Sequence, residues 1–383
     1  MPEPGSGAGY QASEYVFPLV LMLTGGRHSL EDIREIRSDE GLREVLPLGQ
    51  IPSSDAAGDW LRRMGESSGL DGLASANRRF LKRGLKYDGL KEYTLDIDAT
   101  GIESQKAAAA VTYKGYTGYM PIVGNLAENG LIVGDEFREG NESPGTRNLE
   151  FIKYCIEQMP GGKRVKALRA DAASYQADIF NFCDEKEMQF AIGADLDEAV
   201  VRAIESLPEG EWRPYRGGHI AETVHCMNRT KSAFRLIVVR RPYQQGLFAE
   251  ENMKLRYTAM ASNRPEAAEM VMDWYHQRGE CSENRIKELK LGFGMERMPC
   301  GQTVANAVFF RIGAMAYNIC RLFVLKTLTV GWHKHQVQTL RWRLFQTAGK
   351  VVDHANRVYL KVNRRFHVLF DEIRLRIWEF AQT

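Results

Sequence analysis

The sequence predicts a mixed α/β protein whose main sheet is interrupted by a β insertion and flanked by helical regions at both ends. Three observations lead to this fold class. Residues 91–196 carry short apolar and β-branched runs, first as successive strands and then in alternation with helical spacing. Residues 197–264 again favour strands. Residues 1–90 and 329–383 have the apolar spacing of helices. The core therefore comprises residues 91–196 and 265–328.

The composition is that of a large, nearly neutral globular chain. It has 383 residues, with 51 Lys and Arg against 49 Asp and Glu, a formal net charge of +2. Any affinity for nucleic acid must therefore come from local basic surfaces. The six cysteines show no metal-binding spacing, so they are expected to be reduced thiols of a cytoplasmic protein. The apolar run at residues 15–23 is too short to cross a bilayer, so no membrane association is expected.

The N-terminal region, residues 1–90, is expected to be helical. Ser29 precedes Asp32 at the spacing of a capping box, and Ser53 is placed to begin a further helix. A short basic block follows at residues 77–86. Two interpretations stay open, because such helices suit a DNA-contacting module and a solvated helical cap equally well.

The core is expected to begin with strands and to continue with alternating helices and strands. Strands are expected at residues 93–100, 118–124, 131–135, 165–171 and 189–193, and helices at residues 146–158 and 174–187. The strand at residues 165–171 ends on Asp171. Active sites of α/β sheets gather where such strands end, so this acid is the most telling one in the core.

The second half of the chain completes the core and adds a basic tail. Strands of the insertion are clearest at residues 235–240 and 257–262, and helices are expected at residues 265–275, 281–291 and 303–328. The tail, residues 329–383, is expected to be helical and basic, with aromatic residues between its charges. Most of these rings are expected in a core, whereas the basic face is a candidate surface for DNA.

Three carboxylates are candidates for a metal site: Asp98 and Asp171 on strands, and Glu283 on a helix. Taken singly, each acid is better explained as a turn residue or an ion-pair partner. Together they could meet at one edge of the sheet, where oxygen ligands suit two Mg²⁺ or Mn²⁺ ions. Such ions lie about 3.5–4 Å apart and clamp the attacking and leaving oxygens of a phosphodiester. Asp96 points to the same side of its strand as Asp98 and is the alternative first acid.

The charged residues around Glu283 follow helical spacing. Glu283, Lys287 and Lys290 share one face of a helix, and Arg278 lies just upstream. An amphipathic surface helix explains the charges alone. The alternative is that Glu283 binds metal while Arg278 and Lys290 face phosphate, Arg as a planar fork and Lys as a point charge.

These residues resemble the DDE transposases of bacterial insertion sequences, in the group with the signature Tyr-x2-Arg-x3-Glu-x6-Lys. Tyr275 and Arg278 match its first half, and Glu283 and Lys290 match its second half. Four residues, instead of three, separate Arg278 from Glu283. This departure leaves Glu280 as a weaker alternative for the acid.

Further stretches carry the same resemblance. Asp98 stands two residues before Thr100, as in the first-acid strand of the group, and residues 168–175 are similar to the second-acid strand. Residues 257–263 resemble the strand that closes the β insertion before the last acid. The resemblance implies a ribonuclease H-like catalytic domain in which Asp98, Asp171 and Glu283 are catalytic and bind two Mg²⁺ or Mn²⁺ ions.

The resemblance also implies a function. A metal-dependent DNA transposase would bind the terminal inverted repeats of an insertion sequence, cut the element out and join it to target DNA by cut-and-paste transposition. Tyr275, Arg278, Lys287 and Lys290 would contact phosphates, and a homodimer would act on double-stranded DNA in the bacterial cytoplasm, associated with the nucleoid. Two alternatives stay open: a ribonuclease H-like nuclease without strand transfer, and a truncated or catalytically inactive DNA-binding protein derived from an element.

Overall fold

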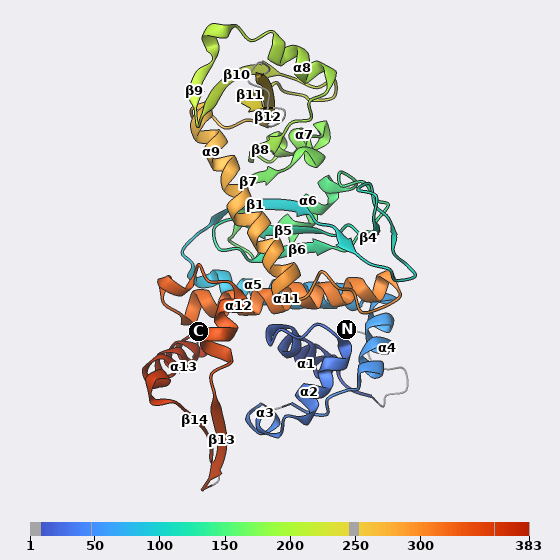
Figure 1. The fold of residues 1–383 in the computed structure, drawn as a ribbon, viewed down its shortest axis with the longest axis vertical. Helices are drawn as coiled ribbons and strands as arrows, with labels where there is room; N and C mark the ends of the chain where they lie inside the picture. The colour runs from blue at the N-terminus through green and yellow to red at the C-terminus, as the bar shows by residue number, and fades with distance from the viewer. Residues whose placement is uncertain (1–8, 47, 245–252, 356, 383) are drawn as a thin grey trace.

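The computed structural model describes residues 9–46, 48–244, 253–355 and 357–382, and a nine-stranded sheet lies at its centre (Figure 1). The strands, in their order across the sheet, are β6 (Ile132–Glu136), β5 (Ile122–Leu126), β1 (Glu92–Ala99), β7 (Arg164–Ala170), β8 (Gln189–Gly193), β12 (Met253–Ser262), β11 (Phe234–Gln244), β10 (Gly218–His225) and β9 (Arg213–Tyr215). β7 is parallel to both β1 and β8, whereas every other neighbouring pair is antiparallel. This mixed sheet confirms the predicted α/β class.

The five strands from β6 to β8 form the part of the sheet that is consistent with a ribonuclease H-like fold. Their order places β1 in the middle, with the antiparallel β5 and β6 on one side and the parallel β7 and β8 on the other. The strand expected at residues 118–124 is divided into β4 (Thr117–Tyr119) and β5. Pro121 lies at the division, and it has no N–H to donate to a ladder. β4 pairs instead with β2 (Ile102–Glu103) and β3 (Ala110–Val111) in a small separate sheet.

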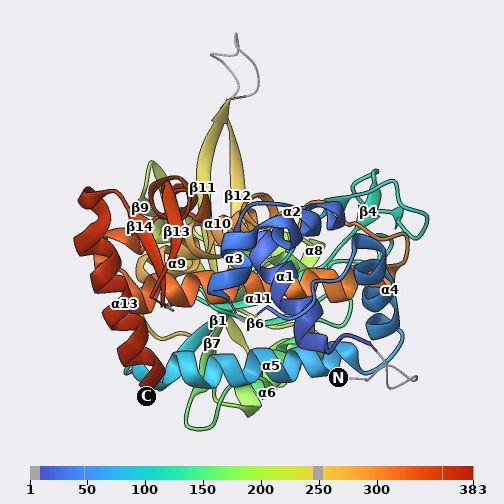
Figure 2. The same ribbon diagram turned by 90° about the horizontal axis from the view of Figure 1, so that it is seen from below.

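The strands of the predicted β insertion extend the main sheet. β12 pairs with β8 through three residues, of which Met260 lies opposite Gly193. β11 and β12 form a long hairpin that projects from the body of the molecule (Figure 2). The strands expected at residues 235–240 and 257–262 lie within this hairpin.

Helices cover both faces of the sheet. α6 (Asn148–Glu157), α7 (Ala177–Glu185) and α8 (Glu198–Glu205) pack on the face to which Leu95 and Ile97 of β1 point. α9 (Ala268–Arg278) packs on the other face, against Ile237 and Val239 of β11. Because side chains alternate along a strand, Asp96 and Asp98 lie on the face that carries α9.

The long helix α11 (Thr303–Thr327) closes the β6 edge of the sheet. The Asn318 side chain accepts a hydrogen bond from the N–H of Ile132 and donates one to its carbonyl, both at 2.8 Å. These bonds satisfy backbone groups that an open edge strand would expose. α11 has the length and apolar composition of a membrane span, yet 67% of its most apolar window is buried inside the protein. It is thus a core helix between the sheet and the N-terminal helices (Figure 1).

The N-terminal region is helical, as predicted. Its helices are α1 (Ala12–Thr24), α2 (Ile33–Ser38), α3 (Glu40–Val45), α4 (Ser54–Gly65) and α5 (Gly69–Gly84). Ser29 and Asp32 form the expected capping box, and Ser53 accepts a hydrogen bond of 3.2 Å from the N–H of Ala56 at the start of α4. α1, α4 and α5 contact α11, so this region packs on the core.

The C-terminal region departs from the helical prediction. α12 (Val337–Leu340) and α13 (His367–Gln382) are helices, but β13 (Gly349–His354) and β14 (Arg357–Val362) form a two-stranded hairpin between them. The helical assignment was therefore wrong for residues 349–354 and 357–362. β-Branched and aromatic side chains such as Val351, Val352 and Tyr359 favour strands and outweigh the helical spacing of the flanking charges.

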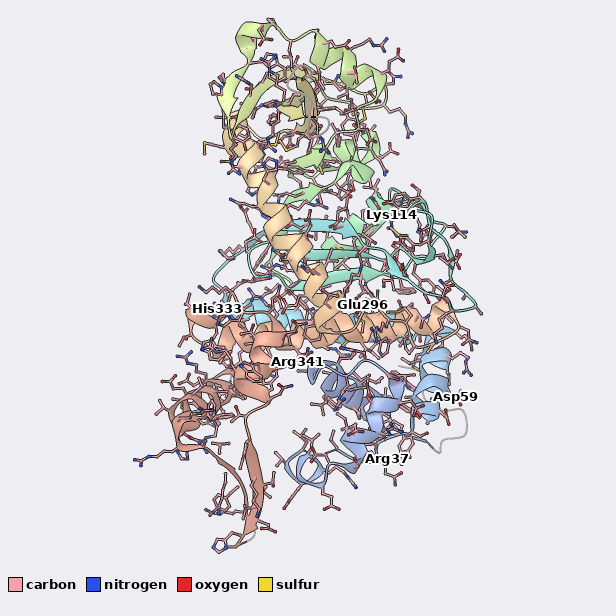
Figure 3. All side chains as sticks on the ribbon, viewed as in Figure 1. Arg37, Asp59, Lys114, Glu296, His333 and Arg341 are labelled. Atoms are coloured by element: carbon pink, nitrogen blue, oxygen red, sulfur yellow. The ribbon has the colours of Figure 1, made fainter. Side chains whose placement is uncertain are left out.

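One basic residue of the tail is structural. Arg341 is only 7% exposed, and Figure 3 labels it between the tail and the N-terminal helices. Its guanidinium donates hydrogen bonds of 2.6–2.8 Å to the carbonyls of Leu23, Thr24 and Gly292. Arg341 therefore joins the last turn of α1 to the core and is not available as a DNA contact.

The five cysteines whose state is described are free thiols, and Cys155, Cys183 and Cys320 are buried. The expectation of reduced cysteines is confirmed for these five. The side chain of Cys281 lies outside the described residues.

Candidate catalytic site

Asp98 and Asp171 lie at the same edge of the sheet. Asp98 is the last residue but one of β1, and Asp171 directly follows β7. The two strands are parallel neighbours in which Asp96 lies opposite Arg169, so their carboxyl ends meet. Asp171 is held in place because its carboxylate accepts a hydrogen bond of 3.2 Å from the N–H of Ala173.

Glu283 reaches this edge from the helix that continues α9. The chain passes from α9 into a π-helical turn, Gly279–Glu283, which contacts β1, and then into α10 (Asn284–Lys287). Burial raises the pKa of Asp98 to about 6, and the negative charges of Asp171 and Glu283 add to this increase. The structure therefore brings the three predicted acids into one electrostatic cluster. The side chain of Glu280, the weaker alternative acid, lies outside the described residues.

Arg278 supplies the positive charge of this cluster. Its Nη2 lies 3.0 Å from Oδ1 of Asp98 and donates a hydrogen bond of 3.1 Å to the carbonyl of Ile97. Arg278 is only 7% exposed, and its Nε has no hydrogen-bond partner among the described residues. Arg278 thus faces the first acid, and its predicted contact with phosphate stays a prediction.

The donor set suits a hard divalent cation, because the three acids offer only carboxylate oxygens. Within the described part of the chain, no three His, Cys, Asp or Glu side chains are grouped as a ready-made metal site. Asp98 instead makes its ion pair with Arg278. Metal binding at this site therefore requires the carboxylates to draw closer around the ion and Arg278 to yield part of its contact with Asp98.

The π-helical turn explains how the extra residue after Arg278 is accommodated. In a regular α-helix, five residues would place Glu283 about 140° around the axis from Arg278. A π-helical turn takes up one additional residue, which reduces the separation to about 40°. Arg278 and Glu283 can therefore both face Asp98, although the spacing differs from the signature.

Deletion of Gly279 is expected to preserve the site. The shortened segment would have the three-residue spacing of the signature, and a regular α-helical turn would keep Arg278 and Glu283 on one face. Cleavage of DNA is expected to stay within about tenfold of wild type, equivalent to about 1.4 kcal/mol in the barrier. Insertion of one alanine after Glu283 is the matched control, because it adds a residue between Glu283 and Lys290, which lies in a second π-helical turn, Glu288–Gly292. Equal losses in the two variants would contradict this explanation.

Tyr275 packs where β8 meets the segment after β7. A Cβ atom added to Gly193 would lie 2.9 Å from the Tyr275 hydroxyl oxygen and 3.1 Å from the backbone nitrogen of Ala172. Burial raises the pKa of the Tyr275 hydroxyl, and the neighbouring carboxylates Asp171 and Asp98 add to the increase. Tyr275 is therefore a close neighbour of the acids, and Gly193 makes room for it.

Gly193→Ala is expected to disturb the site while the protein still folds. The added methyl group would displace either Tyr275 or the segment that carries Asp171, and such misplacement costs up to about 100-fold in rate. Overpacking should lower stability by about 1–3 kcal/mol. Gly210→Ala is the control, because its Cβ would meet no atom within 4 Å. DNA cleavage and thermal melting of both variants test this, and wild-type cleavage by the Gly193 variant would contradict it.

Lys287 and Lys290 line a cavity beside the acids. The cavity has a volume of about 310 Å³ and is also lined by Asp98 and Glu283. Lys290 is half-buried, and its Nζ donates a hydrogen bond of 2.6 Å to the carbonyl of Gly101. Lys287 is exposed. The two lysines therefore differ, because Lys290 is held against the backbone and Lys287 is available to solvent.

A second cavity of about 440 Å³ continues from the first one. It shares four lining residues with the first cavity, namely Ala99, Thr100, Lys290 and Glu296, and it extends to Lys114 beside the small sheet. Figure 3 labels Lys114, on the loop between β3 and β4, and Glu296, on the segment that precedes α11. The small sheet thus forms one wall of the space in front of the acids.

Asp96, the alternative first acid, has a different environment. It is fully buried and receives two hydrogen bonds, of 2.7 and 2.8 Å, from the guanidinium of Arg169. Arg169 also donates a hydrogen bond of 2.6 Å to the carbonyl of Trp274 in α9. This pair joins β1 and β7 to the helix that carries Tyr275 and Arg278.

Sequence reasoning missed three residues of the site. Arg169 precedes Asp171 by two positions and reads as an ordinary strand residue, although an arginine inside an apolar strand is a signal of a buried ion pair. Gly193 ends an apolar strand, where glycine indicates a close approach. Asp195 follows β8, and burial raises its pKa, with Asp197 and Asp171 adding to the increase. Asp195 could have been found as an acid after a third parallel strand.

Carboxylates gathered at the ends of neighbouring central strands offer the oxygen ligands that hard divalent cations prefer. The family model described as "Transposase DDE domain group 1" matches residues 7–374, which is nearly the whole chain. The chain belongs to this family of DDE transposases, and membership implies transposase function and DNA binding. A comparison with curated proteins finds no match.

Proposed function

We propose that this transposase moves an insertion sequence by cut-and-paste transposition, with Asp98, Asp171 and Glu283 as its catalytic acids. The observation that supports the proposal is that the three carboxylates share one electrostatic environment. Burial is the main cause that raises the pKa of Asp98 to about 6, and the charges of Asp171 and Glu283 raise it further. The geometry agrees with this, because Asp98 and Asp171 lie at the carboxyl ends of the adjacent parallel strands β1 and β7, and Asp98 and Glu283 line one cavity.

The three carboxylates would hold two Mg²⁺ or Mn²⁺ ions. When bound, such ions activate a water or a 3′-hydroxyl and stabilise the leaving oxygen of a phosphodiester. Asp98 and Asp171 would provide ligands from adjacent strand ends, and Glu283 would provide them from the helix. Burial is the main cause of the raised pKa of Asp98, and the negative charges of Asp171 and Glu283 add to it; a bound cation would offset both effects.

Some of the basic residues would position the acids, and others would contact the DNA. Arg278 would keep Asp98 oriented before metal binding, because it contacts both this carboxylate and the adjoining backbone. Lys287 would contact phosphate directly, and Lys290 would hold the segment that follows the first-acid strand through its hydrogen bond to the carbonyl of Gly101. Tyr275 would hold the last-acid helix against β8 and contact the same DNA backbone.

We propose a matching division of the chain. Residues 91–196 and 265–328 would form the catalytic core, and residues 197–264 would form the β insertion. Residues 1–90 and 329–383 would contribute DNA contacts. The substrates would be the terminal inverted repeats and the target DNA, bound by a homodimer in the bacterial cytoplasm.

The proposal is tested with DNA that carries the sequences flanking the gene. Purified protein with Mg²⁺ should release the element end and join it to a target plasmid, and a chelator should abolish both products. Cleavage without joined product would favour the nuclease without strand transfer. Absence of both products with intact binding would favour the inactive DNA-binding protein. The extra residue after Arg278, which motivated that alternative, is compatible with activity because the π-helical turn takes it up.

A further inference from the structure

Two arginines face each other across the stem of the long β11–β12 hairpin. Arg241 lies directly opposite Arg256 in the antiparallel register, so both side chains project from the same face of the sheet. Both are exposed, and neither makes an ion pair or a hydrogen bond through its side chain within the described residues. Like charges directly opposite each other are destabilising, so this pair is unfavourable unless an anion joins it.

A third arginine lies next to this pair. Arg216 and Gly217 form the two-residue turn between β9 and β10, with φ of 44° and 76°. Positive φ at both central residues is the usual geometry of a two-residue hairpin turn, so this turn fixes the position of Arg216 beside β10. Arg216 pairs with Asp273 of α9 at 3.0 Å. Asp273 thus matches the charge of Arg216 alone, and the positive charges of Arg241 and Arg256 remain unmatched within the described residues.

Arg216 and Arg241 both lie close enough to α9 to affect the same side chain, His276. Burial lowers the pKa of His276, and the positive charges of Arg241 and Arg216 lower it further. His276 is adjacent to Tyr275 in the helix that leads to Glu283. The arginine cluster, defined as Arg216, Arg241 and Arg256, therefore adjoins the helix of the catalytic site.

On the opposite face of the same strands, the charge of an arginine is paired within the protein. Arg240, the neighbour of Arg241, makes an ion pair with Glu209, and its guanidinium lies 4.3 Å from the ring centroid of Trp212. Its positive charge is matched and covered within the protein. Arg240 thus differs from Arg241 and Arg256, whose charges are unmatched on the face on which α9 lies.

The cluster lies in line with the proposed catalytic site. Met260 of β12 is opposite Gly193, which touches Tyr275. Arg256 is four residues further along the same face, and a strand advances about 3.3 Å per residue. The cluster therefore begins about 13 Å from the Tyr275 end of the site, a distance that a DNA strand leaving the acids would cross.

We infer that Arg216, Arg241 and Arg256 form a binding site for the phosphate backbone of DNA that extends away from the proposed catalytic acids. The inference rests on the proposed function for its ligand. Guanidinium groups bind phosphate oxygens through paired hydrogen bonds, and the anion would relieve the repulsion between Arg241 and Arg256. The site is independent of base sequence, because phosphate contacts carry no sequence information.

The test measures binding of the full chain to a short labelled DNA duplex of arbitrary sequence, in a chelating buffer, over a range of salt concentrations. The double variant R241Q/R256Q should bind more weakly, and its plot of log affinity against log salt should be shallower by about 1.8, or 0.9 for each lost phosphate contact. R241K/R256K should recover most of the slope, because lysine keeps the charge. Melting temperatures should not fall, because the substitution removes a repulsive pair.

R202Q is the matched control. Arg202 lies on α8, which covers the opposite face of the sheet, and its side chain is 68% exposed. This control should leave the salt slope unchanged. An unchanged slope in R241Q/R256Q, or wild-type protein without salt-dependent binding, would overturn the inference. Because no metal or element end is required, loss of cleavage activity in other experiments would refute the proposed function without affecting this result.

Discussion

Asp171→Asn is expected to abolish DNA cleavage while leaving DNA binding intact. The amide oxygen can still accept the hydrogen bond from the N–H of Ala173, so the segment after β7 should keep its conformation. The substitution removes a charge that the proposed metal site needs. Loss of a residue that only orients a metal ligand lowers metal affinity or activity about 10–100-fold. Loss of a direct ligand should therefore lower the cleavage rate by more than about 100-fold.

The measurement compares cleavage rates at saturating Mg²⁺ with affinity for the same DNA. Asp98→Asn and Glu283→Gln should give the same pattern, since all three acids would serve one site. Asp184→Asn is the control, because Asp184 is exposed on α7, away from this edge. Cleavage by the Asp171 variant at near the wild-type rate would refute the assignment.

Asp96→Asn is expected to destabilise the fold by about 3–5 kcal/mol, the usual result of removing one partner from a buried ion pair. The charge of Arg169 would remain, with 1% of its side chain exposed and without its carboxylate. Since Arg169 also bonds to the carbonyl of Trp274, the attachment of α9 to the central strands would weaken. Urea denaturation followed by circular dichroism measures the loss.

The same two strands provide a control. Glu92 and Arg164 also pair across β1 and β7, but their side chains are 48% and 68% exposed. Glu92→Gln should leave the denaturation midpoint nearly unchanged, because solvent screens exposed pairs. Replacing Asp96 and Arg169 together by leucine should restore much of the stability, because no unpaired charge remains. A stable, inactive Asp96→Asn protein would instead favour Asp96 as the first acid.

The sequence predicted the mixed α/β class, because that class follows from local patterns, whereas the catalytic role of the three acids stays a prediction. Apolar alternation located the strands of the core, and Asp171 was recognised from its place after an apolar strand. The resemblance to the signature selected Glu283 among many surface acids. What remained open was the choice between Asp96 and Asp98, since residues two apart on a strand have equivalent patterns.

The remaining features depend on tertiary contacts that spacing does not encode. Arg278 follows the spacing of a phosphate-binding residue, yet the packing of α9 turns it toward Asp98. Arg341 belongs to a basic run, yet it hydrogen-bonds to the end of α1, far away in the sequence. The β13–β14 hairpin shows the reverse case, in which β-branched residues outweighed the helical spacing around them.

The π-helical turn after Arg278 has a consequence for how such proteins are recognised. A π-helical turn accommodates one additional residue within a helix. An insertion or deletion between Arg278 and Glu283 can therefore occur while the Glu283 carboxylate keeps its position. A motif search that requires three residues between the arginine and the glutamate would reject sequences that have four residues there, as this one does. Allowing one additional residue between the arginine and the glutamate should recover them, and the helical bulge then becomes a marker of tolerated length variation.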